Sequence, residues 1–129
     1  MKVQSRMALS LVLGLALGVT SVEILRAQVK PPAYYVAQIE LTGDKDAYIK
    51  NYASLVQATI EPFGGRFLSR GGKVTPVEGD PPRPRIAIIT FDSVEKAQAW
   101  YNSPAYQKIA PVRQSLAKTN SFIVEGLAN

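Results

Sequence analysis

The sequence predicts an α+β fold in which the elements follow the order strand, helix, strand, strand, helix, strand. Short runs rich in Val, Ile, Tyr and Phe alternate with stretches whose apolar residues recur every three or four positions. Clusters of Gly and Pro separate these runs. The 129 residues, of which 47% are apolar and 19% charged, suit a single globular domain.

The N-terminus has the pattern of an export signal helix. Lys2 and Arg6 precede an uncharged apolar run over residues 7–19, which is shorter than the roughly 20 residues that a helix needs to cross a bilayer. Cleavage is expected after Ala27, although the Ala-x-Ala pattern is only half met; an uncleaved anchor and an ordinary packed helix are the alternatives. We assign residues 1–27 to a signal peptide, 28–33 to a linker and 34–129 to the folded domain.

The first strand and the first helix are predicted from a change in periodicity. Residues 34–41 alternate between an apolar side and a mixed side, which is typical of a strand with one face in the core. Asp44 then suits a helix N-cap, because its carboxylate can accept hydrogen bonds from the first free backbone N–H groups. The helix is expected to end before Pro62 and the Gly64-Gly65 pair. Its buried stripe comprises Tyr48, Ile49, Tyr52, Ala53, Val56 and Ile60.

Two strands and a weaker third run follow this helix. Residues 66–70 form a short strand, and Gly71-Gly72 permits a tight turn into a weak edge strand over residues 74–78, whose proline cannot donate to a ladder. Residues 79–84 form a Pro-rich connector. Residues 85–91 are apolar at almost every position, which predicts a strand covered on both faces. Because helices cover only one side of such a sheet, the other side needs a partner.

The last third of the chain contains two helical stretches and a strand. Asp92 or Ser93 caps a helix, and Ser103-Pro104 begins another with proline at its first position. Pro111 is expected to interrupt this second stretch. Residues 122–127 form the last strand. The complete order, β-α-β-β-α-β, is that of a ferredoxin-like α+β sandwich with a four-stranded antiparallel sheet.

Composition excludes several functional classes. The chain contains no Cys and no His, so it lacks a thiolate nucleophile, a Ser-His triad and the commonest zinc and heme ligands. Neither a metal site nor a cofactor is expected. Removal of residues 1–27 takes away three basic residues and one acidic residue, so the net charge falls from +5 to +3. So mild a charge does not indicate nucleic-acid binding, and the mature chain is expected to have no stable membrane span.

Five sequence stretches together resemble the domain-of-unknown-function family 1330, a branch of the dimeric α+β barrel superfamily. They are YYVAQIELTGDKDAYIKNY, FGGRFLSRGG, VEGDPPRPRIAIITFDS, AWYNSPAYQ and FIVEG. The resemblance extends from about Ala33 to Gly126 and departs at Gly43, where relatives often have Asp-Pro before the helix. It implies a ferredoxin-like monomer whose open sheet face packs on a second copy. It implies no established reaction, although other branches of the superfamily include monooxygenases, muconolactone isomerase-like proteins and dye-decolourising peroxidases.

Candidate ligand-binding residues lie around three turns and one helix junction. The predicted site combines the Gly64-Gly65-Arg66 corner, the Glu78-Gly79 segment and the Arg83–Arg85 entry with the junction between the two later helical stretches. Arginine side chains would hold a carboxylate or phosphate, and aromatic rings would stack on the ligand. Solvated loop charges and core packing are the alternative readings. The residues assigned to ligand binding are Arg66, Glu78, Arg85, Trp100 and Tyr106.

Carboxylates offer weaker candidates for chemistry, and no catalytic residue is assigned. Glu40 and Arg70 are placed on strands where they would form either a site pair or an interfacial salt bridge. Glu78 and Glu125 would serve as general acid or base if burial raised their pKa values; ion pairing with arginines is the alternative. Ser93 and Ser103 are helix caps without a base to activate them.

Two functions from different classes follow from these patterns. The first is an exported homodimer, periplasmic or secreted, that binds a small organic acid or aromatic ligand between helices and sheet. The second is a cofactor-free monooxygenase or isomerase that acts on a small aromatic or enolisable substrate and uses an arginine to hold an enolate. A cavity of apolar and Tyr groups favours binding, whereas a buried carboxylate beside an arginine favours catalysis.

Overall fold

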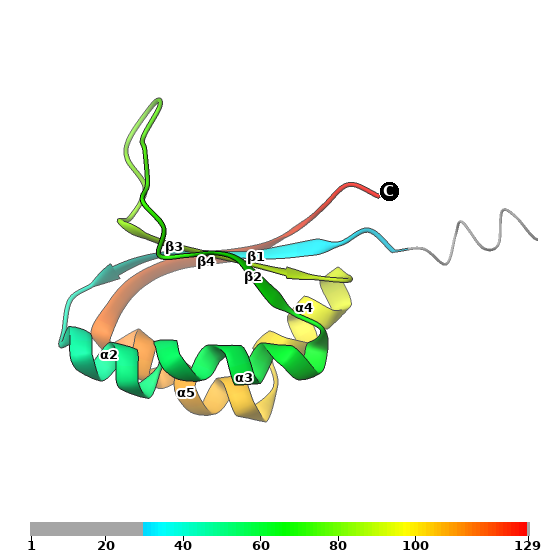
Figure 1. Cartoon of the computed structure of the whole chain (residues 1–129), viewed down its shortest axis with the longest axis horizontal. Helices are drawn as coiled ribbons and strands as arrows, with labels where there is room; N and C mark the ends of the chain where they lie inside the picture. The colour runs from blue at the N-terminus through cyan, green and yellow to red at the C-terminus, as the bar shows by residue number, and fades with distance from the viewer. Residues whose placement is uncertain (1–29, 129) are drawn as a thin grey trace, which may run out of the picture. The chain divides into compact units, whose positions relative to one another are not determined.

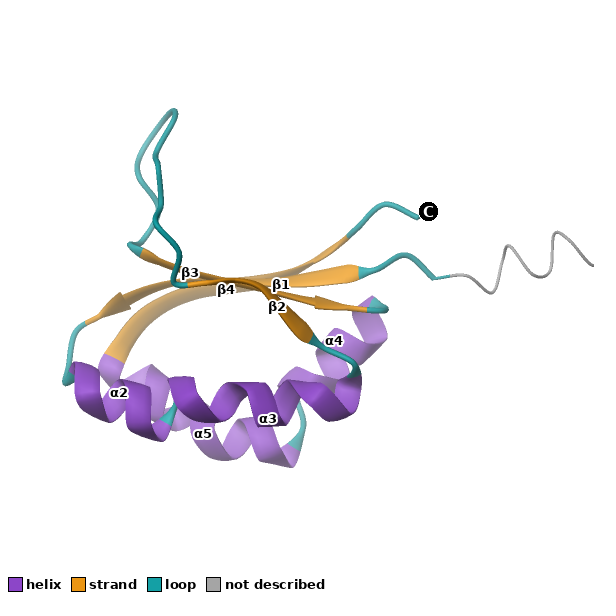
Figure 2. Cartoon of the chain, viewed as in Figure 1, coloured by secondary structure: helices purple, strands orange, loops and turns teal. Residues whose placement is uncertain are grey.

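One layer of helices covers one face of a four-stranded antiparallel sheet in the computed structural model, which describes residues 30–128 (Figures 1 and 2). The predicted signal peptide lies outside the described residues. The sheet order is β2-β3-β1-β4, as a ferredoxin-like sandwich requires. The strands are β1 (Ala33–Leu41), β2 (Arg66–Arg70), β3 (Arg85–Phe91) and β4 (Ala117–Glu125). The helices are α2 (Lys45–Asn51), α3 (Val56–Ile60), α4 (Val94–Tyr101) and α5 (Pro104–Leu116), with 3-10 turns η1 (Ala53–Leu55) and η2 (Glu61–Phe63).

The side chains of the central strand β1 alternate between the two faces of the sheet, as its alternating sequence predicts. Tyr35, Ala37 and Ile39 face the helices and are buried, whereas the residues between them are only half-buried. The strand pairs with β3 along one side and with β4 along the other. It therefore supplies the floor of the space between sheet and helices.

The predicted first helix is present but broken into segments. Asp44 caps α2 as expected, because its carboxylate accepts hydrogen bonds from the backbone N–H groups of Asp46 at 2.8 Å and Ala47 at 3.3 Å. At Tyr52 the backbone leaves the helical region, with φ −136° and ψ −68°, and the chain continues through η1, α3 and η2. Ile49 was predicted to be buried and is 41% exposed, whereas the rest of the predicted stripe is buried, at Tyr48, Tyr52, Ala53, Val56 and Ile60.

Pro111 does not interrupt α5, so the prediction of a break there is wrong. The helix runs from Pro104 to Leu116 with Pro111 inside it. Pro111 is exposed, and its missing N–H deprives only one carbonyl, that of Gln107, which is exposed as well. Ser93 and Ser103 cap α4 and α5 as predicted, through bonds from the backbone N–H groups of Lys96 and Tyr106.

The last strand begins earlier than predicted and follows α5 without a loop. Leu116 ends the helix and Ala117 begins β4, which pairs with β1 from Leu41 back to Ala33. The carbonyl of Leu116 accepts hydrogen bonds from the backbone N–H groups of Thr42 at 2.9 Å and Gly43 at 3.1 Å. The end of α5 is thus fixed to the end of β1.

The predicted edge strand over residues 74–78 does not form. Residues 71–84, here called the 71–84 loop, project from the sheet on the side away from the helices (Figure 1). Four prolines in this loop lack the N–H that a ladder needs, and Val77 is 95% exposed. The base of the loop is held by an ion pair between Arg83 Nη1 and Glu40 Oε2 at 2.9 Å.

The sheet face opposite the helices is uncovered in the single chain and partly apolar, since Gln38, Glu40, Lys118 and Asn120 share it with apolar residues. We call it the outer face. On β3, Ile89 and Phe91 point to the helices and are buried, whereas Ile86 and Ile88 pair with outer-face residues of β1 and are half-buried. The apolar side chains of the outer face are Tyr34, Val36, Ile86, Ile88, Phe122 and Val124.

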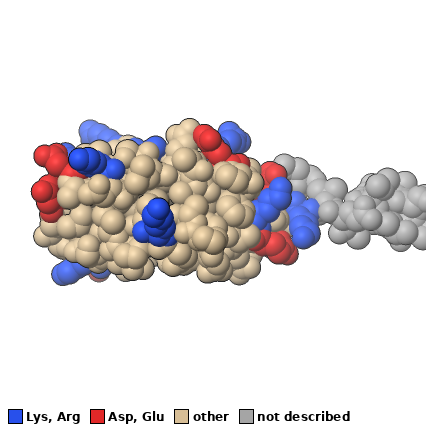
Figure 3. Space-filling model, turned by 90° about the horizontal axis from the view of Figure 1, so that it is seen from below, with Lys and Arg blue, Asp and Glu red and all other residues tan. Residues whose placement is uncertain are grey.

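The opposite, helical face carries few charges near its middle, and most of its charged side chains lie towards its two ends (Figure 3). Within residues 30–128, no helix has the length and apolar character of a membrane span.

Candidate functional site

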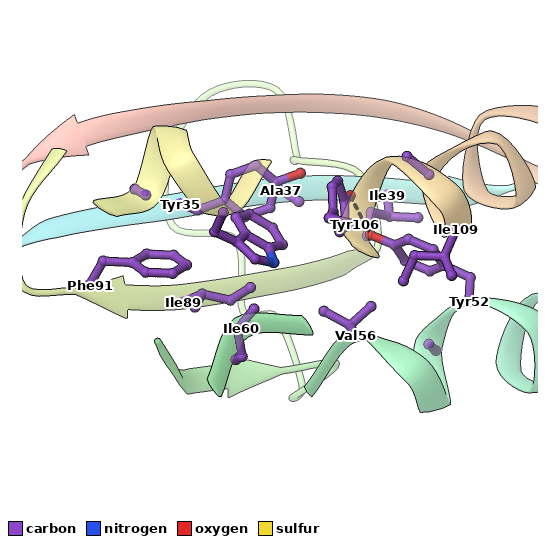
Figure 4. Packing of buried hydrophobic residues seen from close by; sticks show 14 of the residues in the cluster. Tyr35, Ala37, Ile39, Tyr52, Val56, Ile60, Ile89, Phe91, Tyr106 and Ile109 are labelled. Carbon is purple, nitrogen blue, oxygen red and sulfur yellow. Dashed lines mark hydrogen bonds between the residues drawn. The ribbon is translucent and has the colours of Figure 1, made fainter. Parts of the chain in front are cut away.

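An aromatic core forms one wall of the candidate site. Trp100 is fully buried, stacks on Phe91 at 5.4 Å between ring centroids and meets Tyr35 edge-on at 5.0 Å. Tyr106 is also fully buried, and its ring centroid lies 4.4 Å from that of Trp100. Figure 4 shows Tyr35, Ile89 and Phe91 on the sheet side of this core, with Val56 and Ile60 opposite them on α3. Helices α4 and α5 thus contribute Trp100 and Tyr106 to the core, and strands β1 and β3 contribute Tyr35 and Phe91.

A cavity lies between this core and the segmented α2–α3 region. We call it the helix–sheet cavity. Its empty volume is about 400 Å³ with the solvent at its mouth included, and little of that space is wide enough for a water molecule. It is a narrow slot, which suits a flat ligand better than a bulky one. Its lining is Tyr35, Ala37, Ile39, Tyr48, Tyr52, Ala53, Val56, Phe67, Arg70, Arg85, Ala87, Ile89 and Trp100.

Arg85 is fixed at the cavity between an aromatic ring and a glycine. It lies at the start of β3 opposite Ile39, so it faces the helices and not the outer face. Its guanidinium carbon lies 5.6 Å from the centroid of the Tyr48 ring. A Cβ built on Gly71 would lie 3.3 Å from the same carbon, and Gly71 has φ +68°. Glycine at this position therefore meets two needs, the positive φ and the close approach of the guanidinium.

Arg70 is the second cation of the cavity. It lies on β2 opposite Ala87, and its guanidinium carbon stacks 4.5 Å from the centroid of the Phe67 ring. One of its amino groups donates a hydrogen bond to the carbonyl of Ala53, between α2 and α3. This bond orients the guanidinium. We call Arg70 and Arg85 the rim arginines.

The rim arginines have no acidic partner in the part of the chain that the structure describes. The ion pairs there join Arg83 to Glu40 and Lys96 to Asp92. The cavity lining itself contains no carboxylate, and no group of three or more Asp or Glu residues suited to a metal occurs among residues 30–128. The cavity therefore presents positive charge beside an apolar, aromatic interior.

Burial keeps the cavity tyrosines neutral. It raises the pKa of Tyr52 to about 12. Burial also raises the pKa of Tyr35 and that of Tyr48, the latter against the opposing effect of the nearby Arg85 charge. At neutral pH these hydroxyls are hydrogen-bond donors and poor bases.

The structure brings together some of the residues assigned from the sequence and separates others. Arg85 and Trp100 line the helix–sheet cavity, and Tyr106 lies behind it, bonded to Tyr52. Arg66 pairs with Thr90 of β3 and lines a separate surface groove with Gln57, Ile60, Glu61, Gly65 and Phe67. Glu78 is exposed on the 71–84 loop, so it does not reach the cavity.

The expected pairing of Glu40 with Arg70 is wrong. Glu40 pairs instead with Arg83, on the outer-face side of β1. Arg70 points to the opposite side of the sheet, because the extra residue of a β-bulge between Phe67 and Ser69 changes the register of β2. The five-residue sequence of β2 contains no pattern that predicts such a bulge.

Arg113 is a residue that the sequence reasoning missed. It is 4% exposed, and its guanidinium carbon lies 5.7 Å from the centroid of the Tyr52 ring. It follows Tyr106 by seven residues and Ile109 by four, so it shares their buried side of α5. This spacing is present in the sequence. Because Pro111 was expected to break the helix, Arg113 was not placed on the same helix face as Tyr106 and Ile109.

Comparison with known proteins identifies a family but no activity. The model of a family described as a domain of unknown function, DUF1330, matches residues 32–127. No curated protein matches the sequence.

Solved structures with the same fold include proteins without and with a stated activity. A protein of unknown function from Rhodopseudomonas palustris has a TM-score of 0.61 at 17% identity, with 85% of this chain and 94% of that chain covered. SnoaB, described as a cofactor-independent oxygenase from Streptomyces nogalater, has a TM-score of 0.55 at 11% identity, covering 77% and 96%. A dimeric protein of unknown function with a ferredoxin-like fold from Bacteroides fragilis has a TM-score of 0.50 at 7% identity, covering 73% and 95%. These identities show a shared fold alone.

Proposed function

The chain belongs to DUF1330, a family of domains of unknown function, and from its cavity we propose that it binds a small planar organic acid, aromatic in the simplest case. The ring of the ligand would occupy the helix–sheet cavity, and its carboxylate would lie between the rim arginines. The observation that carries this proposal is the pairing of an apolar, aromatic slot with two guanidinium groups that have no acidic partner among residues 30–128.

The rim arginines suit a carboxylate for two physical reasons. A guanidinium group presents several N–H donors in a planar fork that matches the two oxygens of a carboxylate. Arg70 is already oriented by its bond to the carbonyl of Ala53, and Arg85 is held between Tyr48 and Gly71. Preorganised donors lose little conformational entropy when a ligand binds.

The same cavity lacks the groups that most enzymes of this size would use. Its lining contains no carboxylate, and the chain contains no His or Cys, so no side chain there is a good general base at neutral pH. The lining contains two arginines as well as apolar and Tyr groups, but no carboxylate lies beside them, and this favours binding over catalysis.

Cofactor-free oxygenation is the second candidate. Guanidinium groups next to an aromatic slot would also stabilise an enolate oxygen, and SnoaB, which shares the fold, is described as a cofactor-independent oxygenase. This function would require a substrate acidic enough to lose a proton without a strong base. Oxygen consumption with enolisable or phenolic acids would distinguish it from binding alone.

Two further parts of the proposal concern assembly and location. We propose a homodimer that buries the outer face of each sheet, because that face exposes apolar side chains in the single chain and a structural neighbour is described as dimeric. We also propose export to the periplasm or outside the cell, on the pattern of residues 1–27. Intact mass of the protein from a periplasmic fraction tests the cleavage after Ala27.

The ligand proposal is tested by calorimetry with aromatic carboxylic acids and their uncharged primary amides. The acids should bind and the amides should not. Arg85→Ala should weaken acid binding by on the order of tenfold to a hundredfold, the range of hydrogen bonds to charged groups. Arg66→Ala is the matched control, since Arg66 lies on the neighbouring strand but does not line the cavity. Equal affinity of the parent and the Arg85→Ala variant for every acid would overturn the proposal.

A further inference from the structure

The buried cation Arg113 has no acidic partner in the described part of the chain. Its side chain is 4% exposed, and its Nε–H has no hydrogen-bond partner among residues 30–128. The groups that surround it are the hydroxyls of Tyr35, Tyr52 and Tyr106, with which its charge interacts. A buried guanidinium is costly unless neighbouring groups accept its hydrogen bonds. The tyrosine oxygens are the acceptors at hand.

The charge of Arg113 sets the direction of a hydrogen-bond chain. The hydroxyls of Tyr52 and Tyr106 lie 2.8 Å apart, and the geometry alone allows either to donate (Figure 4). Among these hydroxyls the charge of Arg113 interacts most strongly with Tyr106, and a guanidinium group has donors and no acceptor. A positive charge attracts the Tyr106 oxygen and repels its proton, so this proton is directed away from Arg113, to the oxygen of Tyr52.

This direction leaves the Tyr52 hydroxyl proton without an acceptor, and the hydroxyl of Tyr35, a second lining residue, has no hydrogen-bond partner among residues 30–128 either. The oxygen of Tyr52 accepts from Tyr106, so the proton of Tyr52 must find a different acceptor, and no other hydrogen bond of its hydroxyl occurs among the described residues. Tyr52 lines the helix–sheet cavity, whereas Tyr106 and Arg113 do not. Each donor in such a chain polarises the next one, so the Tyr52 hydroxyl is strengthened as a donor.

We propose that the Tyr52 hydroxyl, oriented by Tyr106 and Arg113, recognises an oxygen atom of the ligand at the inner end of the helix–sheet cavity. The inference rests on the proposed function and narrows it. The ligand would be a planar acid with a hydroxyl or carbonyl oxygen at the end opposite its carboxylate. Tyr52 is then a specificity-determining residue, and Tyr106 and Arg113 are positioning residues.

A carboxylate at this inner end would be a poorer fit than a neutral or partly charged oxygen. Arg113 does not line the cavity, so it could not form a direct ion pair there. Burial raises the pKa of Tyr52 to about 12, which keeps its proton in place as a donor at neutral pH. The rim arginines remain the site for full negative charge.

The test compares 4-hydroxybenzoate with 4-methylbenzoate by calorimetry on the mature protein. The two acids have the same shape, but only the hydroxyl can accept a hydrogen bond. The parent should bind 4-hydroxybenzoate at least tenfold more tightly. Tyr52→Phe should bring the two affinities together by weakening the hydroxy acid while leaving 4-methylbenzoate within about twofold. Tyr101→Phe is the matched control, because Tyr101 packs on Tyr106 but does not line the cavity.

Arg113→Gln tests the positioning role separately. The variant keeps an amide donor but loses the charge, so the preference for 4-hydroxybenzoate should fall while 4-methylbenzoate still binds. Folding is checked by the fluorescence of Trp100, the single tryptophan.

Three results would count against the inference. Equal affinity of the parent for the two acids overturns it and leaves the proposed function standing. Equal weakening of both acids by Tyr52→Phe assigns Tyr52 a packing role only. Failure of the parent to bind either acid overturns both the inference and the proposed function.

Discussion

The indole N–H of Trp100 donates a hydrogen bond to the hydroxyl of Thr59 at 3.0 Å, and that hydroxyl donates in turn to the carbonyl of Val56 at 2.6 Å. The pair joins α4 to α3 through the core, beneath the helix–sheet cavity. Trp100 has no exposed surface, so without Thr59 its one polar atom would be buried and unpaired.

Thr59→Val should destabilise the fold by about 1–3 kcal/mol, because valine keeps the branched shape and removes the acceptor of the indole N–H. Urea unfolding followed by circular dichroism measures the change in variants with and without Trp100. The double variant Thr59→Val, Trp100→Phe removes both polar atoms, so its cost should be smaller than the sum of the two single costs. Additive costs would show that the hydrogen bond contributes nothing.

Gly71→Ala should lower both stability and acid binding. A non-glycine residue at φ +68° costs about 1–2 kcal/mol, and the new methyl group would press on the Arg85 guanidinium. Gly79→Ala is the matched control, because Gly79 has φ +77° and no atom lies within 4 Å of the position that its new methyl group would take. The control should lose a similar amount of stability but retain full affinity for aromatic acids in calorimetry. Loss of affinity in both variants would count against the placement of Arg85 at the ligand.

Ile88→Glu and Ile89→Glu should have different effects on adjacent residues of β3. Ile88 lies on the outer face, so a glutamate there should leave the monomer folded and prevent dimer formation. Ile89 is 1% exposed beneath the helices, so a glutamate there should unfold the chain. Light scattering and circular dichroism separate the two outcomes. A dimer that persists in folded Ile88→Glu protein would exclude the outer face as the interface.

Stability should fall as the pH rises from about 10 to about 12. Burial raises the pKa of Tyr52 from 10.0 to about 12, so in this window the unfolded chain loses a proton that the folded chain keeps. The stabilisation is complete below pH 10 and decreases by up to about 1.4 kcal/mol per pH unit for each such group. Urea unfolding at a series of pH values measures the slope, and Tyr52→Phe should reduce it. An unchanged slope in that variant would assign the effect to other groups.

Local sequence patterns predicted the elements whose burial follows one simple period. β1 alternates strictly, β3 is apolar throughout, and Asp44, Ser93 and Ser103 cap helices as their side chains suggest. Predictions failed where a local rule was overridden by tertiary structure. Pro111 is tolerated because it faces solvent, and β4 starts at Ala117 because residues 117–121 pair with β1 despite their polar composition.

The candidate site was only partly predictable for the same reason. Arg85 and Trp100 were assigned to ligand binding, and both line the cavity. Glu78 was placed there through a hairpin that does not form, and Arg70 reaches the cavity through a bulge. A prediction that Arg113 is buried would have required α5 to continue through Pro111. A site formed between a sheet and a helical layer depends on the register in which the strands pair. The spacing of residues along one chain segment does not determine that register.

The loop-free joint between α5 and β4 has a mechanical consequence. Leu116 and Ala117 are consecutive, and the Leu116 carbonyl accepts hydrogen bonds from the N–H groups of Thr42 and Gly43. Helix α5 and edge strand β4 should therefore move together as one rigid unit. The α2–α3 wall, in contrast, is jointed at Tyr52 and by two 3-10 turns. Local opening that widens the cavity should therefore occur in the α2–α3 region. The backbone amides of that region should exchange with deuterium before those of Thr42 and Gly43.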